Sequence, residues 1–517
     1  MSQPDPWALR REGKPEEALQ LAREILEVDP EDSFVRQCAF WCLYDLAKPD
    51  LEKVKELGRD QADGDVNRLI ASCADRLSEM MEYYQDDDTQ RSTVGWFAAR
   101  CALQAARRGE EAVVVNLVKA YRKAVPTPTA EVYHSLLLSA ILQLESPPPW
   151  FGKFLQYWNL ANLQEDDYKG NEFETPEGKR VKGRSLAARA VSAAAKFFAE
   201  NPNEESGWFD MAAREILARV RDDTWIAYHF AKYLLARGRS EEALPYLDHA
   251  LEATRGNAAA WSLLSSTFEA MGYADAAVAS AVEACNRDAT VCGRKPYEMI
   301  AQALEGKDPE RAAEWREFAN TFADVWKATT PDEQRENQKQ FSKRVRAALE
   351  RSASLLESIP WSDFVKTGRF TVGVGVVETI NPEKKAILVR RSGEDRPVRL
   401  NVGFAMQDRI KKSGPGTVLE LLMSNPPRTI YAARFASGDQ QMEGVREMTG
   451  RVRRKAEQPF AFVEQDGLSA YIPPELVARH KLTDQATVKV KVMKSIDPKK
   501  GKEGWRVIHV LSTSEGG

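Results

Sequence analysis

Hydrophobic positions follow a helical period along the first two thirds of the chain and a strand period along the rest. Between residues 223 and 328, apolar residues recur every three or four positions in paired segments. A glycine separates the segments of a pair, and Gly238, Gly272 and Gly306 are 34 residues apart. After Pro360, hydrophobic and polar residues alternate in short runs bounded by turn residues, which predicts β-strands. The pattern predicts a multidomain, mostly α protein followed by small all-β barrels.

A 34-residue period with glycine at the hairpin turn and alanine in the second helix is typical of tetratricopeptide (TPR) repeats. Large side chains of one helix fill the space beside small side chains of the next. Such repeats leave a groove for a partner and rarely catalyse reactions, so we expect a protein partner in the TPR groove. The residues expected to pack these repeats are Trp261, Leu264, Phe268, Gly238, Gly272, Ala243 and Ala277.

Charge separates the β-rich end from the helical body. Residues 360–517 contain 27 Lys and Arg against 18 Asp and Glu, whereas the whole chain has a formal net charge of −4. A basic end on an acidic body suggests that the end meets a polyanion. No apolar run approaches the roughly 18 residues of a membrane helix, and the N-terminal residues do not resemble a signal peptide. We therefore expect a cytoplasmic protein with no membrane partner.

The last β unit contains five short strand patterns, which suit a small closed barrel of the OB type. Two of them are aromatic, Phe460-Ala-Phe-Val and Tyr471-Ile-Pro-Pro-Glu. Over about residues 450–511 these motifs resemble the cold-shock domain, especially that of ribonuclease R-like exonucleases. Pro459 and Ala461 stand where the family has glycines. The exonuclease's catalytic domain is missing, so the resemblance does not imply degradation.

This resemblance implies a nucleic-acid-binding surface, because in the family these strands present aromatic residues to bases and basic residues follow the phosphates. It assigns base stacking to Phe460, Phe462 and Tyr471. The basic residues that it places near phosphates are Arg453, Arg454, Lys455 and Arg506. The alternative is a degenerate barrel that uses the aromatic residues in its core or binds protein.

Three segments extend a resemblance to the whole chain. They are Arg10-Arg-Glu-Gly-Lys-Pro-Glu-Glu-Ala-Leu, Trp41-Cys-Leu-Tyr-Asp-Leu and Tyr157-Trp-Asn-Leu-Ala-Asn-Leu. Together they resemble a group of bacterial TPR proteins that end in cold-shock-like domains. That group is linked to predicted conflict or phage-defence systems, which implies a bacterial defence or stress context.

Changes in period, proline runs and charge divide the chain into six expected segments, since 517 residues exceed a single core. These are 1–48, an N-terminal TPR-like helical hairpin; 49–222, a helical repeat-like region with a charged loop at 165–184; 223–328, TPR repeats; 329–359, a charged linker helix; 360–438, a β-rich OB-like domain; and 444–513, a cold-shock- or OB-like domain.

The sequence lacks the common motifs of catalysis and metal binding. The sequence has no phosphate-binding Gly-x-x-x-x-Gly-Lys loop, no His-Glu-x-x-His helix and no Gly-x-Ser-x-Gly turn. We expect no catalytic residues, no metal and no cofactor. The sequence predicts a non-enzymatic TPR scaffold that couples protein partners to RNA or single-stranded DNA through C-terminal barrels. The alternative is a pure protein–protein adaptor with degenerate OB barrels.

Overall fold

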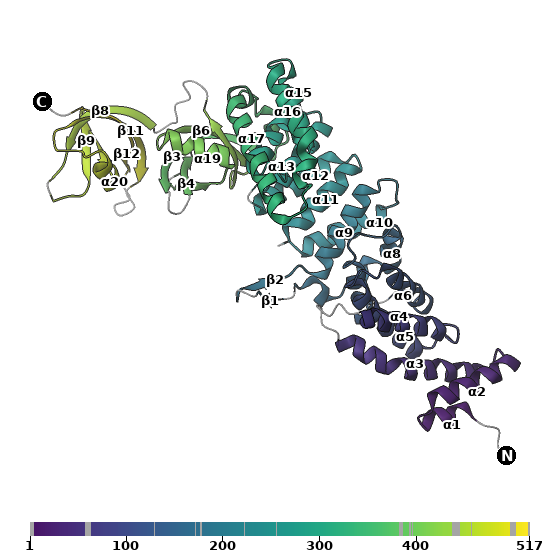
Figure 1. Ribbon diagram of the computed structural model, residues 1–517. Coiled ribbons are helices and arrows are strands. Elements are labelled where there is room, and N and C mark those ends of the chain that lie inside the picture. The colour runs from purple at the N-terminus through teal and green to yellow at the C-terminus, as the bar shows by residue number, and fades with distance from the viewer. Residues whose placement is uncertain are drawn as a thin grey trace. The chain divides into compact units, whose positions relative to one another are not determined.

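The structure is a computed structural model, and it divides into two compact units, Met1–Arg237 and Gly238–Gly517 (Figure 1). The six segment boundaries expected from the sequence stay predictions. The described residues are 5–56, 64–128, 130–170, 172–175, 178–221, 223–254, 256–381, 386–391, 394, 396–436, 445–455, 457–496 and 503–514.

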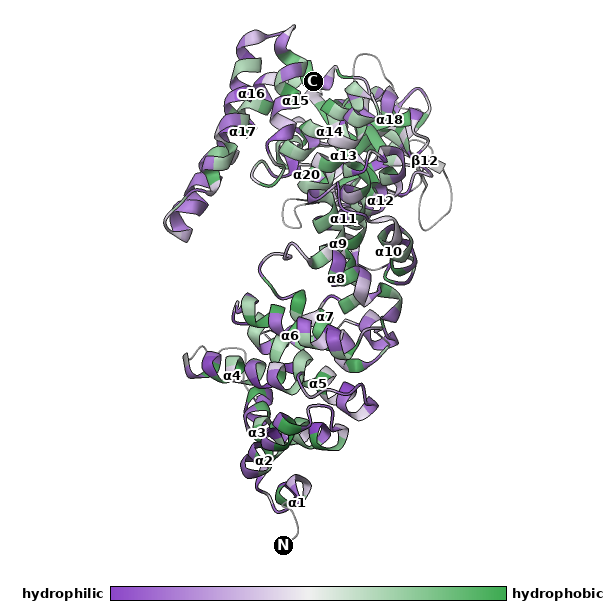
Figure 2. Cartoon of the chain, turned by 90° about the vertical axis from the view of Figure 1, so that its right-hand side faces the viewer, coloured by the Kyte–Doolittle hydropathy of each residue, from purple (hydrophilic) through white to green (hydrophobic). Residues whose placement is uncertain are grey.

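The first unit is built from helices whose hydrophobic and hydrophilic residues are interleaved along the chain (Figure 2). Pro15 occupies the first turn of α2, where a missing N–H has no cost. Pro49 lies inside α3, which runs on to Glu56. The helices are α1 Pro6–Arg11, α2 Pro15–Val28, α3 Ser33–Glu56, α4 Gly64–Met80, α5 Asp88–Ala106, α6 Glu111–Ala124, α7 Val132–Ile141, α8 Phe151–Trp158, η1 Leu160–Asn162, η2 Glu165–Tyr168, α9 Leu186–Glu200, α10 Gly207–Arg219 and α11 Thr224–Ala236.

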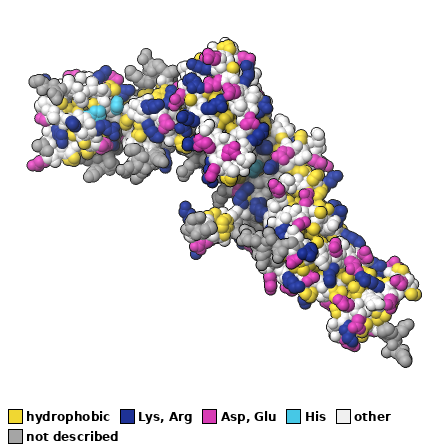
Figure 3. Space-filling view, in the orientation of Figure 1, with side chains coloured by type: hydrophobic (Ala, Val, Ile, Leu, Met, Phe, Trp, Pro, Cys, Tyr) yellow, Lys and Arg dark blue, Asp and Glu magenta, His cyan; other side chains and the backbone are white. Residues whose placement is uncertain are grey.

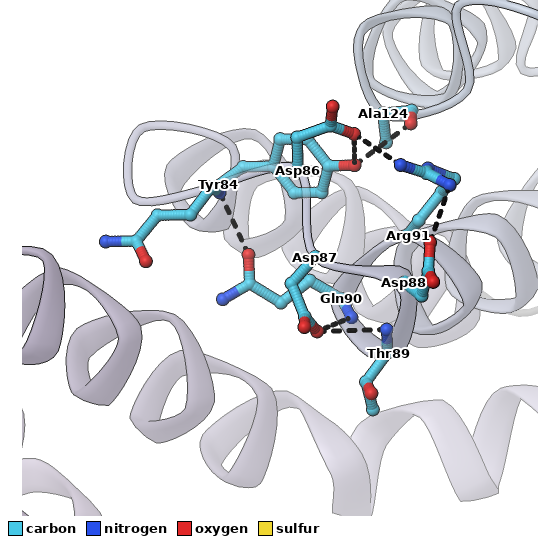
Figure 4. A network of polar contacts seen from close by, with 9 residues as sticks. Tyr84, Asp86, Asp87, Asp88, Thr89, Gln90, Arg91 and Ala124 are labelled. Carbon is cyan, nitrogen blue, oxygen red and sulfur yellow. Dashed lines mark hydrogen bonds and ion pairs between the residues drawn. The ribbon is translucent and has the colours of Figure 1, made fainter.

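A local polar network fixes the start of α5 (Figure 4). The Asp87 carboxylate accepts hydrogen bonds from the backbone N–H groups of Thr89, at 2.9 Å, and Gln90, at 3.0 Å. Arg91 reaches back from the first turn to Asp86, at 2.6 Å. A side-chain cap of this kind is worth about 1 kcal/mol, so the residues themselves specify where this helix begins.

The predicted charged loop at 165–184 contains a helical turn and a two-stranded ribbon. After η2, strand β1 (Glu172–Glu174) pairs antiparallel with β2 (Arg180–Lys182), and Phe173 lies opposite Val181. All six strand residues are exposed. The polar composition therefore predicted the exposure of this segment, and the strand pairing was missed.

The second unit begins with paired helices that carry the 34-residue period. Trp261, Leu264 and Phe268 on α13 are fully buried, and so are the small residues Ala243 on α12 and Ala277 on α14. Large residues of one helix thus lie in the same core as small residues of its neighbours. The helices are α12 Ser240–Ala253, α13 Ala258–Ala270, α14 Ala274–Arg287, α15 Lys295–Glu305, α16 Pro309–Thr321, η3 Phe322–Trp326, α17 Pro331–Glu357 and α18 Ser362–Lys366.

Two β units follow, and both have three strands, a short helix and then two strands. The first consists of β3 Phe370–Asn381, β4 Ala386–Arg391, β5 Val398–Leu400, α19 Phe404–Ser413, β6 Val418–Ser424 and β7 Ile430–Phe435. The second consists of β8 Val445–Arg453, β9 Ala461–Gln465, β10 Leu468–Ile472, α20 Pro474–Arg479, β11 Thr487–Ile496 and β12 Glu503–Ser514.

The two β units differ in how the sheet closes. The first is a five-stranded sheet in the order β5-β4-β3-β6-β7, in which β5 and β7 are the edges. In the second, the corresponding strands β10 and β12 pair in parallel, and the sheet closes into a barrel in the order β10-β12-β11-β8-β9. The fold class predicted from the sequence, helical repeats followed by small all-β barrels of the OB or cold-shock type, is confirmed, with the difference that the sheet of the first β unit is open.

The first β unit packs directly against the repeat helices of its own compact unit. Arg287 on α14 donates hydrogen bonds to the backbone carbonyls of Asn401, at 2.8 Å, and Tyr431, at 2.7 Å. The Tyr431 hydroxyl donates to Asp248 on α12, at 2.7 Å. These contacts hold the β unit on α12 and α14, so the change of period after Pro360 marks a change of fold within one compact unit.

Candidate nucleic-acid interface

Four side chains form a row across the outside of the barrel, and we call them the aromatic row. Arg453 on β8 lies opposite Phe462 on β9, Phe462 opposite Tyr471 on β10, and Tyr471 opposite Arg506 on β12. Residues opposite one another on neighbouring strands point to the same face of the sheet. The aromatic row therefore places two rings between two guanidinium groups.

The two rings of this row and the neighbouring ring of Phe460 lie outside the barrel core. Ala461 and Val463, which flank Phe462 in β9, are buried, so Phe462 points outward and is 38% exposed. Phe460 and Tyr471 are half-buried. The core itself is aliphatic, with Val452, Ile472, Val488 and Val490 among its members. These positions leave the three aromatic rings on the surface and fill the interior with small branched side chains.

Phe460, Phe462 and Tyr471 contact one another as a cluster of three rings. The ring centroids of Phe460 and Phe462 are 5.9 Å apart, those of Phe460 and Tyr471 5.6 Å, and those of Phe462 and Tyr471 5.9 Å. Such tilted and edge-on packing holds each ring in place without covering all of its faces. The structure thus brings together all three residues to which the sequence resemblance assigns stacking.

The four basic candidates have different surroundings. Arg453 is exposed and forms an ion pair with Glu464, at 2.8 Å. Lys455 is exposed and has no ion-pair partner among the described residues. Arg454 is half-buried, and its guanidinium donates to the backbone carbonyl of Leu482, at 2.9 Å. This hydrogen bond stabilises the chain segment that precedes β11. Arg454 is therefore not among the proposed phosphate contacts.

Arg506 lies between two carboxylates that the sequence analysis did not single out. Its guanidinium is 3.8 Å from Glu475, at the start of α20, and 3.6 Å from Glu378 in the first β unit. Glu378 is buried and already paired with Arg390, at 2.9 Å. The position of Glu475 directly after the aromatic Ile-Pro-Pro motif is the signal that could have identified it. Both ion pairs of Arg506 are long, so its charge is only partly neutralised.

The described part of the chain offers no evident centre for metal binding. Across those residues, no three His, Cys, Asp or Glu side chains gather as metal ligands. The six cysteines are buried thiols, and the Sγ atoms of Cys38 and Cys42 lie 3.9 Å apart within α3. As for membranes, every described helix is too short or too polar to span a bilayer.

The fold and the interface together define a helical-repeat protein that ends in an S1/cold-shock-like barrel. Residues 446–510 match the family described as S1/CSD-like domain 2 of the TOTE conflict systems. This match confirms the predicted resemblance of the chain to a conflict-system-linked group whose members have C-terminal cold-shock-like domains. The crystal structure of yeast Tom70 is similar over 71% of this chain and 85% of that chain, with 12% identity and a TM-score of 0.26. No curated protein matches the sequence.

Proposed function

We propose that the chain is a non-enzymatic scaffold whose C-terminal barrel binds RNA or single-stranded DNA with little sequence preference. The aromatic row carries this proposal, because it sets the exposed ring of Phe462 and the half-buried ring of Tyr471 between two arginines, outside the barrel core. Bases stack on Phe460, Phe462 and Tyr471, and every base offers a face for stacking. Arg453, Lys455 and Arg506 contact phosphates.

We further propose that the helical repeats hold a protein partner, which the barrel brings to the nucleic acid. Repeat helices use their surfaces for partners rather than for chemistry. The match of residues 446–510 to a conflict-system domain supports a defence or stress setting. Pull-down of the intact protein, with and without nuclease, tests both halves. A protein partner should survive nuclease treatment, and copurifying nucleic acid should not.

The stacking test replaces Phe460, Phe462 and Tyr471 by Ala, singly and together. Each single change should weaken the binding of a labelled single strand by about 1–3 kcal/mol, or roughly 5- to 150-fold, in fluorescence anisotropy. Leu511→Ala is the matched control, because Leu511 lies on the same barrel and is also 38% exposed, as Phe462 is. The control should bind like the parent.

Salt dependence separates phosphate contacts from stacking. Arg453→Ala and Lys455→Ala should each reduce the slope of log affinity against log salt by about 0.7, whatever the base sequence. A folded triple aromatic variant that binds as tightly as the parent would leave the protein–protein adaptor as the better function. An unfolded triple variant would mean that the rings support the core.

A further inference from the structure

A groove of about 1200 Å³ lies between the two β units, beside the aromatic row. The end of β3 and helix α19 line one side, and α20 and β12 line the other. The β units touch beneath it, because Val376 of β3, Met493 of β11 and Ile508 of β12 are buried against one another. This apolar contact belongs to a single compact unit and holds the two walls together.

The groove is lined by more positive than negative side chains. Five Lys or Arg residues and three carboxylates face it, and one of the carboxylates, Glu378, is already neutralised by Arg390. Lys412 on α19 and Arg479 on α20 are exposed and have no carboxylate partner among the described residues. In the view of Figure 3, dark blue Lys and Arg and cyan His side chains lie over the β units. These charges favour an anionic occupant.

Two histidines add to the same wall. Burial lowers the pKa of His480, and the positive charge of Arg479 lowers it further. Burial also lowers the pKa of His509, with further contributions from His480, Lys491 and Arg479. Burial and the positive neighbours therefore favour the neutral form of both imidazoles, and a neutral imidazole N–H can donate a hydrogen bond to a phosphate oxygen. The described side chains around these histidines therefore favour phosphate over a cation as the bound ligand.

Phe404 supplies an aromatic surface in the groove. It begins α19 and is 60% exposed, although a large aromatic side chain is ordinarily buried in a folded domain. The Arg346 guanidinium of α17 lies 5.9 Å from the centre of its ring. A flat ring beside a cation is the combination that holds a nucleobase and its phosphate.

Arg506 connects the groove to the aromatic row. It lies opposite Tyr471 in the row, and it also lines the groove together with Glu475. A strand that leaves the ring of Tyr471 in this direction meets Arg506 first and the groove next. The charge and the exposed aromatic ring thus continue along one path from one β unit to the other.

We propose that this groove binds a second segment of the same single strand, with a base on Phe404 and phosphates at Lys412 and Arg479. The inference rests on the proposed function, because the aromatic row holds the first segment. It makes the first β unit part of the nucleic-acid site. The occupant must then be longer than the row alone accommodates.

The test compares strands of two lengths on the full chain. A strand of about 6 nucleotides covers the aromatic row, and one of about 18 nucleotides reaches both segments. Phe404→Ala should weaken binding of the long strand by about fivefold or more and leave the short strand unchanged. Lys412→Ala with Arg479→Ala should reduce the salt slope of the long strand by about 1.4. Lys489→Ala, an exposed charge of β11 paired with Glu447, is the control.

Each outcome distinguishes this inference from the proposed function. If the groove variants bind the long strand like the parent while the aromatic variants lose both strands, the groove proposal fails and the proposed function stands. If the aromatic variants bind both strands normally, the proposed function fails and the groove is not a continuation of the row. Unchanged melting curves of the Phe404 and Lys412/Arg479 variants show that the fold is intact.

Discussion

The repeat glycines allow a sharp test of what holds the helical hairpins. Gly272 and Gly306 occupy equivalent positions of the 34-residue period, but their backbones differ. Gly272 has a φ of +79°, in the left-handed region, whereas Gly306 has a φ of −83°. A Cβ atom at either position would meet no other atom within 4 Å. Alanine at either site therefore changes the backbone preference without creating a clash.

The expected difference follows from the backbone alone. Alanine in the left-handed region costs about 1–2 kcal/mol. Replacing glycine also reduces the entropy of the unfolded chain, which stabilises by about 0.4–1 kcal/mol at both sites. That second contribution cancels when the two variants are compared. Gly272→Ala should thus be less stable than Gly306→Ala by about 1–2 kcal/mol, and Gly306→Ala should be at least as stable as the parent.

Hydrogen exchange of the full chain is the suitable assay, because two compact units need not unfold in one step. Amides of α13 and α14 should exchange about 5- to 30-fold faster in Gly272→Ala than the same amides in Gly306→Ala. Gly272→Asn should recover part of the loss, since Asn tolerates positive φ. Equal effects of the two alanines would refute the argument that φ governs this turn.

Two further predictions concern titration and charge. His134 is fully buried between the Tyr121 hydroxyl and the Trp158 carbonyl, and burial lowers its pKa from 6.5 to about 4. The neutral form is therefore favoured in the folded state, and His134 should contribute a loss of about 3 kcal/mol to the stability of the first unit as pH drops from 6.5 to 4. Burial also lowers the pKa of His229, in the same unit, to about 4, so His229 should contribute a similar loss. His134→Gln should remove about half of the decline in urea-unfolding midpoints over that pH range, and an equally steep decline in the variant would contradict this. Glu475→Gln should tighten single-strand binding about two- to fivefold by removing the carboxylate beside Arg506, whereas Glu447→Gln should not; a weaker-binding Glu475→Gln would show that the carboxylate orients Arg506.

The sequence was most informative where a pattern repeats or alternates. The 34-residue period identified the α13–α14 hairpin because Trp261, Phe268 and Ala277 must share one core. The cold-shock resemblance, and not alternation, assigned Phe462 and Tyr471 to one surface. Alternation predicted the strands β9 and β10 themselves, because side chains alternate between the two faces along a strand. These are local regularities, and they need no knowledge of distant parts of the chain.

Features that depend on contacts between residues far apart in the sequence could not be predicted from the sequence. Arg454 looks like its neighbours in sequence, yet only the return of the chain at Leu482 decides that its guanidinium bonds to a carbonyl. The groove depends in the same way on β3 meeting β12, so nothing in the local sequence marked Phe404 or Lys412.

The spacing of the aromatic row has a consequence for the shape of a bound strand. The centres of the Phe462 and Tyr471 rings are 5.9 Å apart, whereas successive bases in a stacked strand are about 3.4 Å apart. A strand that lays one base on each ring must therefore be stretched and lose its own stacking. Adenine runs, which stack well, should resist this extension more than thymine or uracil runs. Binding to the barrel would extend the strand and separate its bases, so that the bound segment could not pair with another segment to form a hairpin.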